Sequence, residues 1–99
     1  MSIEGWRREI DELDLELLEL LNKRARLSIK VGALKRHSGL PVCDPERERS
    51  VLERLQQANA GPLDPQAVAK LFRRVIQESR RLQATASHET PAHLQEIAL

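Results

Sequence analysis

The fold is decided by residues 3–34, IEGWRREIDELDLELLELLNKRARLSIKVGAL, in which every third or fourth position belongs to one series. The series is Ile3, Trp6, Ile10, Leu13, Leu17, Leu20, Arg24, Leu27, Val31 and Leu34. Alternating steps of three and four residues place side chains on the face of an α-helix that packs against another helix. All of these side chains are apolar except Arg24, whose permanent charge needs an anionic partner or a site that admits an anion. The series predicts a long packed helix, and Arg24 is the first candidate for a functional residue.

Composition narrows the class of protein. The chain of 99 residues suits one small domain, and its aromatic residues are one Trp and one Phe. Charged residues make up 31% but nearly cancel, to +1, whereas a nucleic-acid-binding domain usually carries a one-sided basic excess. No segment is apolar enough to be a signal peptide or a membrane span, and the lone Cys43 has no partner for an internal disulfide. We therefore expect a cytoplasmic protein without nucleic-acid or membrane partners.

Start and stop signals predict three helices and an all-α fold. The first should run from an N-cap at Ser2 to about His37, where the segment SGLP at 38–41 ends it. Asp-Pro pairs at 44–45 and 64–65 start the other two, which should end near residues 58 and 86. Residues 87–99 are polar, contain Pro91 and lack periodicity. We interpret 1–86 as a helical domain and 87–99 as a tail or linker.

The length of the first helix predicts a homodimer. A helix of roughly 35 residues is about 50 Å long, whereas a compact domain of about 100 residues has a radius of gyration of only about 13 Å. The apolar series therefore extends beyond anything that the rest of the chain can build around it. We therefore expect a second copy of the chain to pack against the part of the helix that extends beyond the rest of the protomer.

Two further cationic residues of the first helix are candidates for a site. Lys35 follows Arg24 by eleven residues, which places both on nearly the same side, about 16 Å apart, so that their long side chains can close on a small anion. Arg7 precedes Arg24 by seventeen residues, about 25 Å along the helix and roughly 260° around it. Arg7 and Arg24 of one helix cannot hold the same small ligand, so a functional Arg7 would serve the site of the partner chain.

The other two helices add polar groups to apolar faces. Glu48 lies on the line of Val51, Leu52 and Leu55, with Arg47 beside it. On the third helix, Ser79 and Gln83 continue a stripe made by Val68, Leu71, Phe72, Val75, Ile76 and Leu82. Buried polar groups are costly unless they are paired, so their recurrence on three helices favours a shared site.

Each of these residues also has a purely structural interpretation. Arg24 could pair with a glutamate and fix the helix register, and Lys35 could extend to solvent. Glu48 could pair with Arg47, Arg49 or Lys35, Asp44 could be only a helix cap, and Ser79 and Gln83 could lie on the surface. The histidines at 37, 88 and 93 lack metal-ligand spacing, and Cys43 has no neighbouring histidine base, so we expect neither a metal site nor a thiol nucleophile.

The ordered set of these residues resembles the all-α (AroQ-type) chorismate mutases over about residues 3–84. The matching pattern is Arg7-x2-Ile10-x3-Asp14, Arg24, Val31-Gly32-x2-Lys35, Pro41-Val42-x-Asp44-x2-Arg47-Glu48-Arg49 and Ser79-x3-Gln83. The resemblance implies a three-helix protomer that intertwines as a homodimer. It also implies the rearrangement of chorismate to prephenate, without metal or cofactor, on the route to phenylalanine and tyrosine.

The resemblance further implies a role for each matched residue. Arg7 of one chain and Arg24 of the other would bind the two carboxylates of chorismate, assisted by Ser79 and Arg47. Lys35 and Gln83 would donate to the ether oxygen of the breaking bond, and Glu48 with the backbone N–H of Asp44 would hold the ring hydroxyl. Three alternatives stay open: an isochorismate-pyruvate lyase, a mutase of the amino analogue (aminodeoxychorismate), and a non-catalytic helical dimerisation module.

Overall fold

The computed structural model describes residues 2–86 of the 99-residue chain. It contains three helices and, within the described range, no strand: α1 (Ile3–His37), α2 (Pro45–Ala58) and α3 (Pro65–Ala86). The predicted all-α fold and the positions of the three helices are confirmed. The predicted tail at 87–99 lies outside the described residues and stays a prediction.

Side-chain caps start all three helices, as their sequences indicated. In each case a side-chain oxygen accepts the backbone N–H three residues later: Ser2 Oγ from Gly5 at 3.1 Å, Asp44 Oδ1 from Arg47 at 3.1 Å, and Asp64 Oδ1 from Ala67 at 2.8 Å. α1 ends at His37 and is followed by a turn at Gly39, whose φ of 68° only glycine adopts without cost. That turn lets the N–H of Leu40 reach the carbonyl of Lys35 at 2.8 Å and sends the chain towards α2.

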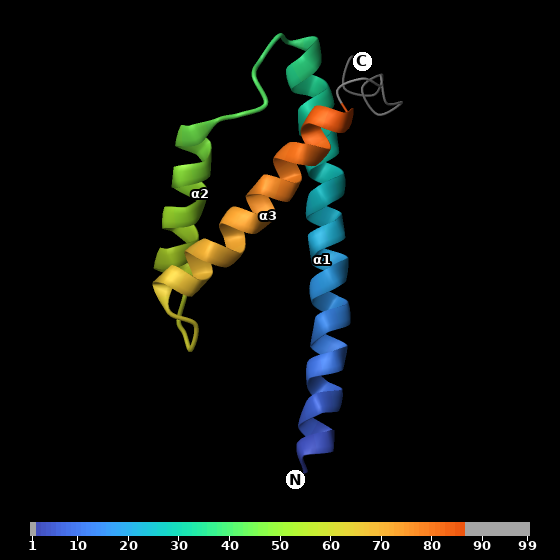
Figure 1. Ribbon diagram of the computed structural model, residues 1–99, viewed down its shortest axis with the longest axis vertical. Coiled ribbons are helices and arrows are strands. Elements are labelled where there is room, and N and C mark those ends of the chain that lie inside the picture. Colours follow the sequence, from blue (N-terminus) through green and yellow to red (C-terminus); the bar gives the residue numbers. More distant parts are fainter. Residues whose placement is uncertain (1, 87–99) are drawn as a thin grey trace.

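The helices form an open arrangement in which α3 crosses diagonally from α2 to α1 (Figure 1). α3 packs on both other helices, whereas the described parts of α1 and α2 make no backbone contact with each other. The N-terminal half of α1 projects beyond α2 and α3 (Figure 1). The resulting radius of gyration is 16.9 Å, larger than the about 13 Å of a compact domain of this length.

The core of one chain is small. Its buried apolar side chains are Ala33, Val51, Val68, Ala69 and Ile76, and no large side chain among residues 2–86 is fully buried. α1 and α3 approach closely at Gly32, where an added Cβ would lie 2.7 Å from the Cα of Gln83. Glycine at this position therefore permits the crossing that brings Lys35 and Gln83 together.

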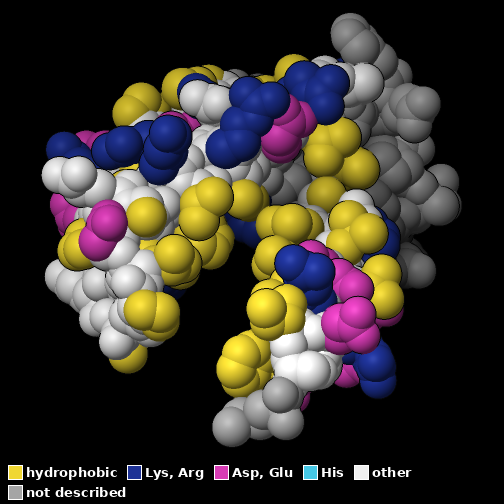
Figure 2. Space-filling model, turned by 60° about the horizontal axis from the view of Figure 1, so that its bottom comes forward, with side chains coloured by type: hydrophobic (Ala, Val, Ile, Leu, Met, Phe, Trp, Pro, Cys, Tyr) yellow, Lys and Arg dark blue, Asp and Glu magenta, His cyan; other side chains and the backbone are white. Residues whose placement is uncertain are grey.

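Most of the apolar series on α1 is exposed. From Trp6 (52% exposed) to Leu20 (64%), neither α2 nor α3 covers it. Figure 2 shows hydrophobic side chains along both inner sides of the gap between the projecting part of α1 and the opposite end of the molecule. Leu71, which belongs to the apolar stripe predicted for the third helix, is 56% exposed. No helix within residues 2–86 is apolar enough over a sufficient length to cross a membrane.

Candidate functional site

One cavity of about 440 Å³ lies between the C-terminal half of α1, the start of α2 and the last turns of α3. Its lining includes seven of the eight residues singled out in the sequence: Arg24, Lys35, Asp44, Arg47, Glu48, Ser79 and Gln83. These residues come from all three helices and from the α1–α2 connection. The volume falls in the range of ordinary small-molecule sites.

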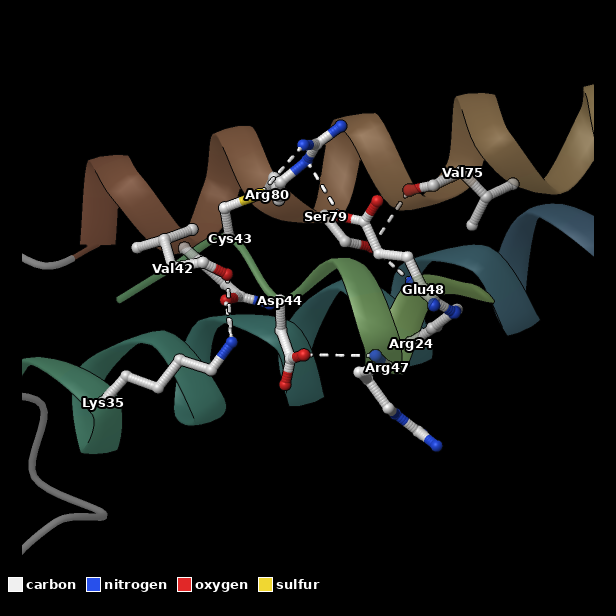
Figure 3. Close-up of polar contacts among 11 residues, drawn as sticks. Arg24, Lys35, Val42, Cys43, Asp44, Arg47, Glu48, Val75, Ser79 and Arg80 are labelled. Carbon is white, nitrogen blue, oxygen red and sulfur yellow. Dashed lines mark hydrogen bonds and ion pairs between the residues drawn. The ribbon is translucent and has the colours of Figure 1, made fainter. Parts of the chain in front are cut away.

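Arg24 is held by α3 and leaves most of its guanidinium free. Its Nη1 donates to Oγ of Ser79, whose own hydroxyl donates to the carbonyl of Val75 at 3.0 Å (Figure 3). The backbone carbonyl of Arg24 accepts from Oγ of Ser28 at 3.1 Å. Within residues 2–86 no carboxylate pairs with Arg24, so the structural alternative of a register-fixing glutamate is wrong for the described chain. The guanidinium has five N–H donors, and those not used by Ser79 are available to a ligand.

Lys35 and Gln83 form a pair of donors on the opposite side of the cavity from Arg24. Nζ of Lys35 donates to the carbonyl of Val42 at 3.1 Å (Figure 3). It also donates to Oε1 of Gln83 at 3.3 Å. An ammonium has three N–H bonds, so one remains. Because Oε1 of Gln83 is the acceptor, its Nε2 provides two more donors. No acceptor within the described residues takes the backbone N–H of Asp44, which also lines this part of the cavity.

The structure identifies Arg80 as a site residue that the sequence interpretation missed. Nε of Arg80 lies 3.2 Å from Oε1 of Glu48, so the partner of this carboxylate is neither Arg47, Arg49 nor Lys35 (Figure 3). Nη1 of Arg80 also lies 3.6 Å from Sγ of Cys43. A signal was present in the sequence, because Arg80 lies between Ile76 and Gln83 with the spacing i, i+4, i+7 that defines one helix face.

Of the arginines predicted for the site, Arg47 lines the cavity and Arg7 does not. Arg47 lines the cavity, but its side chain points away from the cluster of polar contacts, and its backbone N–H serves the Asp44 cap (Figure 3). Arg7 is exposed on the projecting half of α1 and does not line the cavity of its own chain.

The charge of the cavity lining defines the kind of ligand that it suits. Arg24, Lys35, Arg47 and Arg80 contribute four positive charges, and Asp44 and Glu48 contribute two negative charges, which leaves +2. The walls between these groups are apolar: Leu27, Val31, Val42, Val51 and Ile76. The charges and the apolar walls of this lining would suit a small dianion with an apolar middle.

Comparisons with known proteins give the family. The chain matches the family described as chorismate mutase type II over residues 6–84. It is 47% identical over 72 residues to a bifunctional chorismate mutase/prephenate dehydratase of Neisseria gonorrhoeae, covering 73% of this chain and 19% of that protein. It is 32% identical over 85 residues to a chorismate mutase of Methanocaldococcus jannaschii, covering 85% of this chain and 86% of that one.

A solved structure supports the same assignment. The crystal structure of chorismate mutase from Helicobacter pylori in complex with prephenate superposes with a TM-score of 0.80 at 34% identity, over 88% of this chain and 94% of that chain. The chain therefore belongs to the type II chorismate mutase family. It spans about a fifth of the length of the bifunctional relatives to which it is similar.

Proposed function

We propose that this chain catalyses the rearrangement of chorismate to prephenate. The observation that carries the proposal is the cavity itself, with a lining of net +2 and with Lys35 and Gln83, which keep unused N–H donors, opposite Arg24. Chorismate is a dicarboxylate, and its rearrangement is unimolecular. The protein needs only to hold the reactive conformer and to stabilise the charge that develops as bonds change.

Binding of the carboxylates is the first task. The free donors of Arg24 match the fork geometry of a carboxylate, and the Ser79 contact fixes the plane of the guanidinium. Arg47 lies at the rim of the same cavity and can turn inward to assist. We propose that Arg7 of a second copy binds the other carboxylate.

Stabilisation of the transition state is the second task. As the ether C–O bond of chorismate breaks, negative charge grows on that oxygen, and donors already in place bind it better than the neutral ether. We assign this role to Lys35, through its remaining N–H, and to Nε2 of Gln83. A millionfold acceleration corresponds to about 8 kcal/mol of differential stabilisation, which a few charge-assisted contacts in a partly dry cavity can supply.

The ring hydroxyl is held by a third group of residues. We assign the Glu48 carboxylate as its acceptor and the unpaired backbone N–H of Asp44 as a donor to it. A carboxylate at this position favours chorismate over isochorismate, whose ring hydroxyl is attached elsewhere.

The proposal includes a homodimer with shared sites. The exposed apolar series of α1 needs a partner, and an apolar pocket lined by Leu21, Ala25, Val75 and Leu82 lies directly beside Ser79. A second copy that covers both surfaces would bring its Arg7 towards Arg24 of the first. Such a protein suits the cytoplasm, where the exposed thiol of Cys43 stays reduced.

The decisive experiment is turnover of chorismate by the purified chain, with the product identified by NMR. We expect prephenate. Unchanged chorismate with a folded dimer would overturn the proposal. The next substrates to test would then be aminodeoxychorismate and isochorismate, and failure of all three would indicate a dimerisation module without catalytic activity.

The role of Lys35 has its own test. Lys35→Ala should lower kcat by about 100-fold with little change in KM, because the interaction forms mainly in the transition state. Lys30→Ala is the control, since Lys30 is exposed on the same helix and does not line the cavity. An unchanged kcat would remove Lys35 from the ether-oxygen role.

A further inference from the structure

We propose that Arg80, acting through Glu48, makes the site select a neutral hydroxyl over a cationic amine on the substrate ring. The inference deepens the proposed function and rests on it, because it assumes that Glu48 faces the ring substituent. It concerns the choice between chorismate and its amino analogue, which carries an amine in place of that hydroxyl. No motif in the sequence pattern assigned Arg80 to the site.

The geometry ties Arg80 to Glu48. Nε of Arg80 lies 3.2 Å from Oε1 of Glu48, and the guanidinium is held from a second side by Sγ of Cys43 at 3.6 Å. Both side chains are partly buried, with 36% of Arg80 and 26% of Glu48 exposed. Arg80 also lies on the wall that separates the cavity from an outer groove between α2 and α3. The pair is therefore a built part of the site, unlike the exposed Arg81–Glu78 pair one residue further along α3.

The opposite charges of Arg80 and Glu48 explain why the site would select a hydroxyl over an ammonium. A carboxylate alone attracts an ammonium strongly and accepts a hydrogen bond from a hydroxyl more weakly. The primary amine of the analogue is protonated near neutral pH, as alkyl amines are. With Arg80 beside it, Glu48 can still accept a hydrogen bond, but the pair has no net charge to attract a cation. The guanidinium also repels an ammonium that approaches the same carboxylate.

A purely structural ion pair would behave differently. If Arg80 only joined α2 to α3, its removal would lower stability and would affect both substrates alike. If Arg80 instead neutralises Glu48 beside the ring substituent, its removal must change the preference of the protein between the two substrates. The ratio of kcat/KM for the two substrates thus separates a structural role of Arg80 from a role in selectivity.

The test compares chorismate and aminodeoxychorismate in the intact chain. For each variant, kcat/KM is measured with both compounds, and where the amine is not turned over, its Ki against chorismate replaces kcat/KM. We expect Arg80→Met to move the preference towards the amine by about tenfold. Arg80→Lys should keep most of the wild-type preference, because it keeps the charge. Arg81→Met is the matched control, one residue along the helix, and should leave the ratio within about twofold.

Glu48→Gln should move the substrate preference in the opposite direction. It leaves Arg80 uncompensated, so the preference should move away from the amine, and Glu48→Gln/Arg80→Met should return close to the wild-type ratio. If circular dichroism shows that Arg80→Met does not fold, Arg80→Gln, which removes the same charge but keeps a polar side chain, takes its place and should move the preference towards the amine in the same way.

Two results would overturn the inference: an unchanged ratio in folded Arg80→Met, or a shift towards the amine in Glu48→Gln. Failure of the proposed function is visible separately, because wild-type protein would then neither turn over nor bind chorismate. In that case the inference about Arg80 fails with it.

Discussion

The two halves of α1 share one sequence pattern but differ in their surroundings. In the C-terminal half, Ser28, Gly32 and Ala33 are buried against α3, and Arg24 and Lys35 line the cavity. In the N-terminal half, no residue from Ile3 to Leu20 is buried, although the apolar series continues without a break. The pattern therefore specifies a face that requires cover, and it does not specify which chain provides that cover.

The two halves of α1 differ because α3 packs against only one of them. α3 (Pro65–Ala86) crosses α1 only near its C-terminal end (Figure 1). Long helices in proteins owe most of their stability to packing of an apolar face, so the projecting half needs a partner that the described chain lacks. We therefore expect the covered half to carry the chemistry and the uncovered half to carry the dimer contacts and Arg7.

The largest expected effect links the two halves. Arg24→Ala in the covered half and Arg7→Ala in the uncovered half should each lower kcat/KM by about 1000-fold, because each removes a carboxylate partner. After the two variants are unfolded and refolded together in equal amounts, half of the dimers should be mixed. Each mixed dimer has one intact site of two, so activity should return to about a quarter of wild type. Proven mixed dimers without recovered activity would contradict the shared site.

The next-largest effect tests whether the apolar series on the projecting half of α1 packs against a second copy of the chain. Leu17→Lys should weaken the dimer by at least about 100-fold, because symmetry removes two buried leucines at once. Leu15→Lys is the matched control: the same substitution, two residues away, on the opposite side of the helix, at a side chain that is also exposed. Sedimentation equilibrium measures both. Equal behaviour of the two variants would show that the apolar series is not the dimer face.

A smaller effect compares two glycines of α1. Gly32→Ala should lower the free energy of unfolding by about 1–2 kcal/mol, because the new Cβ would lie 2.7 Å from the backbone of Gln83, which cannot turn aside. It should also lower kcat, because it separates Lys35 from Gln83. Gly5→Ala is the control in the uncovered half, where the nearest atom is Oγ of Ser2 at 3.4 Å, and it should be neutral or stabilising by up to about 1 kcal/mol. Chemical denaturation at fixed protein concentration measures both, and equal losses would contradict the close crossing.

The smallest effect concerns the caps. Asp64→Ala removes the cap of α3 and should cost about 1 kcal/mol, whereas Ser2→Ala at the free end of α1 should cost about 0.5 kcal/mol. The same denaturation measurement applies. A larger loss for Ser2→Ala would mean that the start of α1 is held more tightly than we infer.

Much of the fold could be predicted because its signals are local. The apolar series, the Asp-Pro starts and the Gly39 stop fixed all three helices within about one residue. Seven of the eight predicted site residues line one cavity, and polar groups on apolar faces are conspicuous in sequence; their roles stay predictions. Leu71 belongs to the apolar stripe of α3 and is nevertheless 56% exposed, because periodicity gives the face of a helix but not how much of that face is covered.

The sequence by itself therefore determined three capped helices, an apolar face on α1 longer than α2 and α3 cover, and the polar residue types that line the cavity. Only the tertiary structure decided which groups meet. It showed that Ser79, and no glutamate of the described chain, contacts Arg24, that Lys35 reaches both Val42 and Gln83, and that Glu48 pairs with Arg80. The physical reason is that helix periodicity is set by neighbours along the chain, whereas pairing depends on how helices cross. The crossing of α1 and α3 is itself set by the absence of a side chain at Gly32.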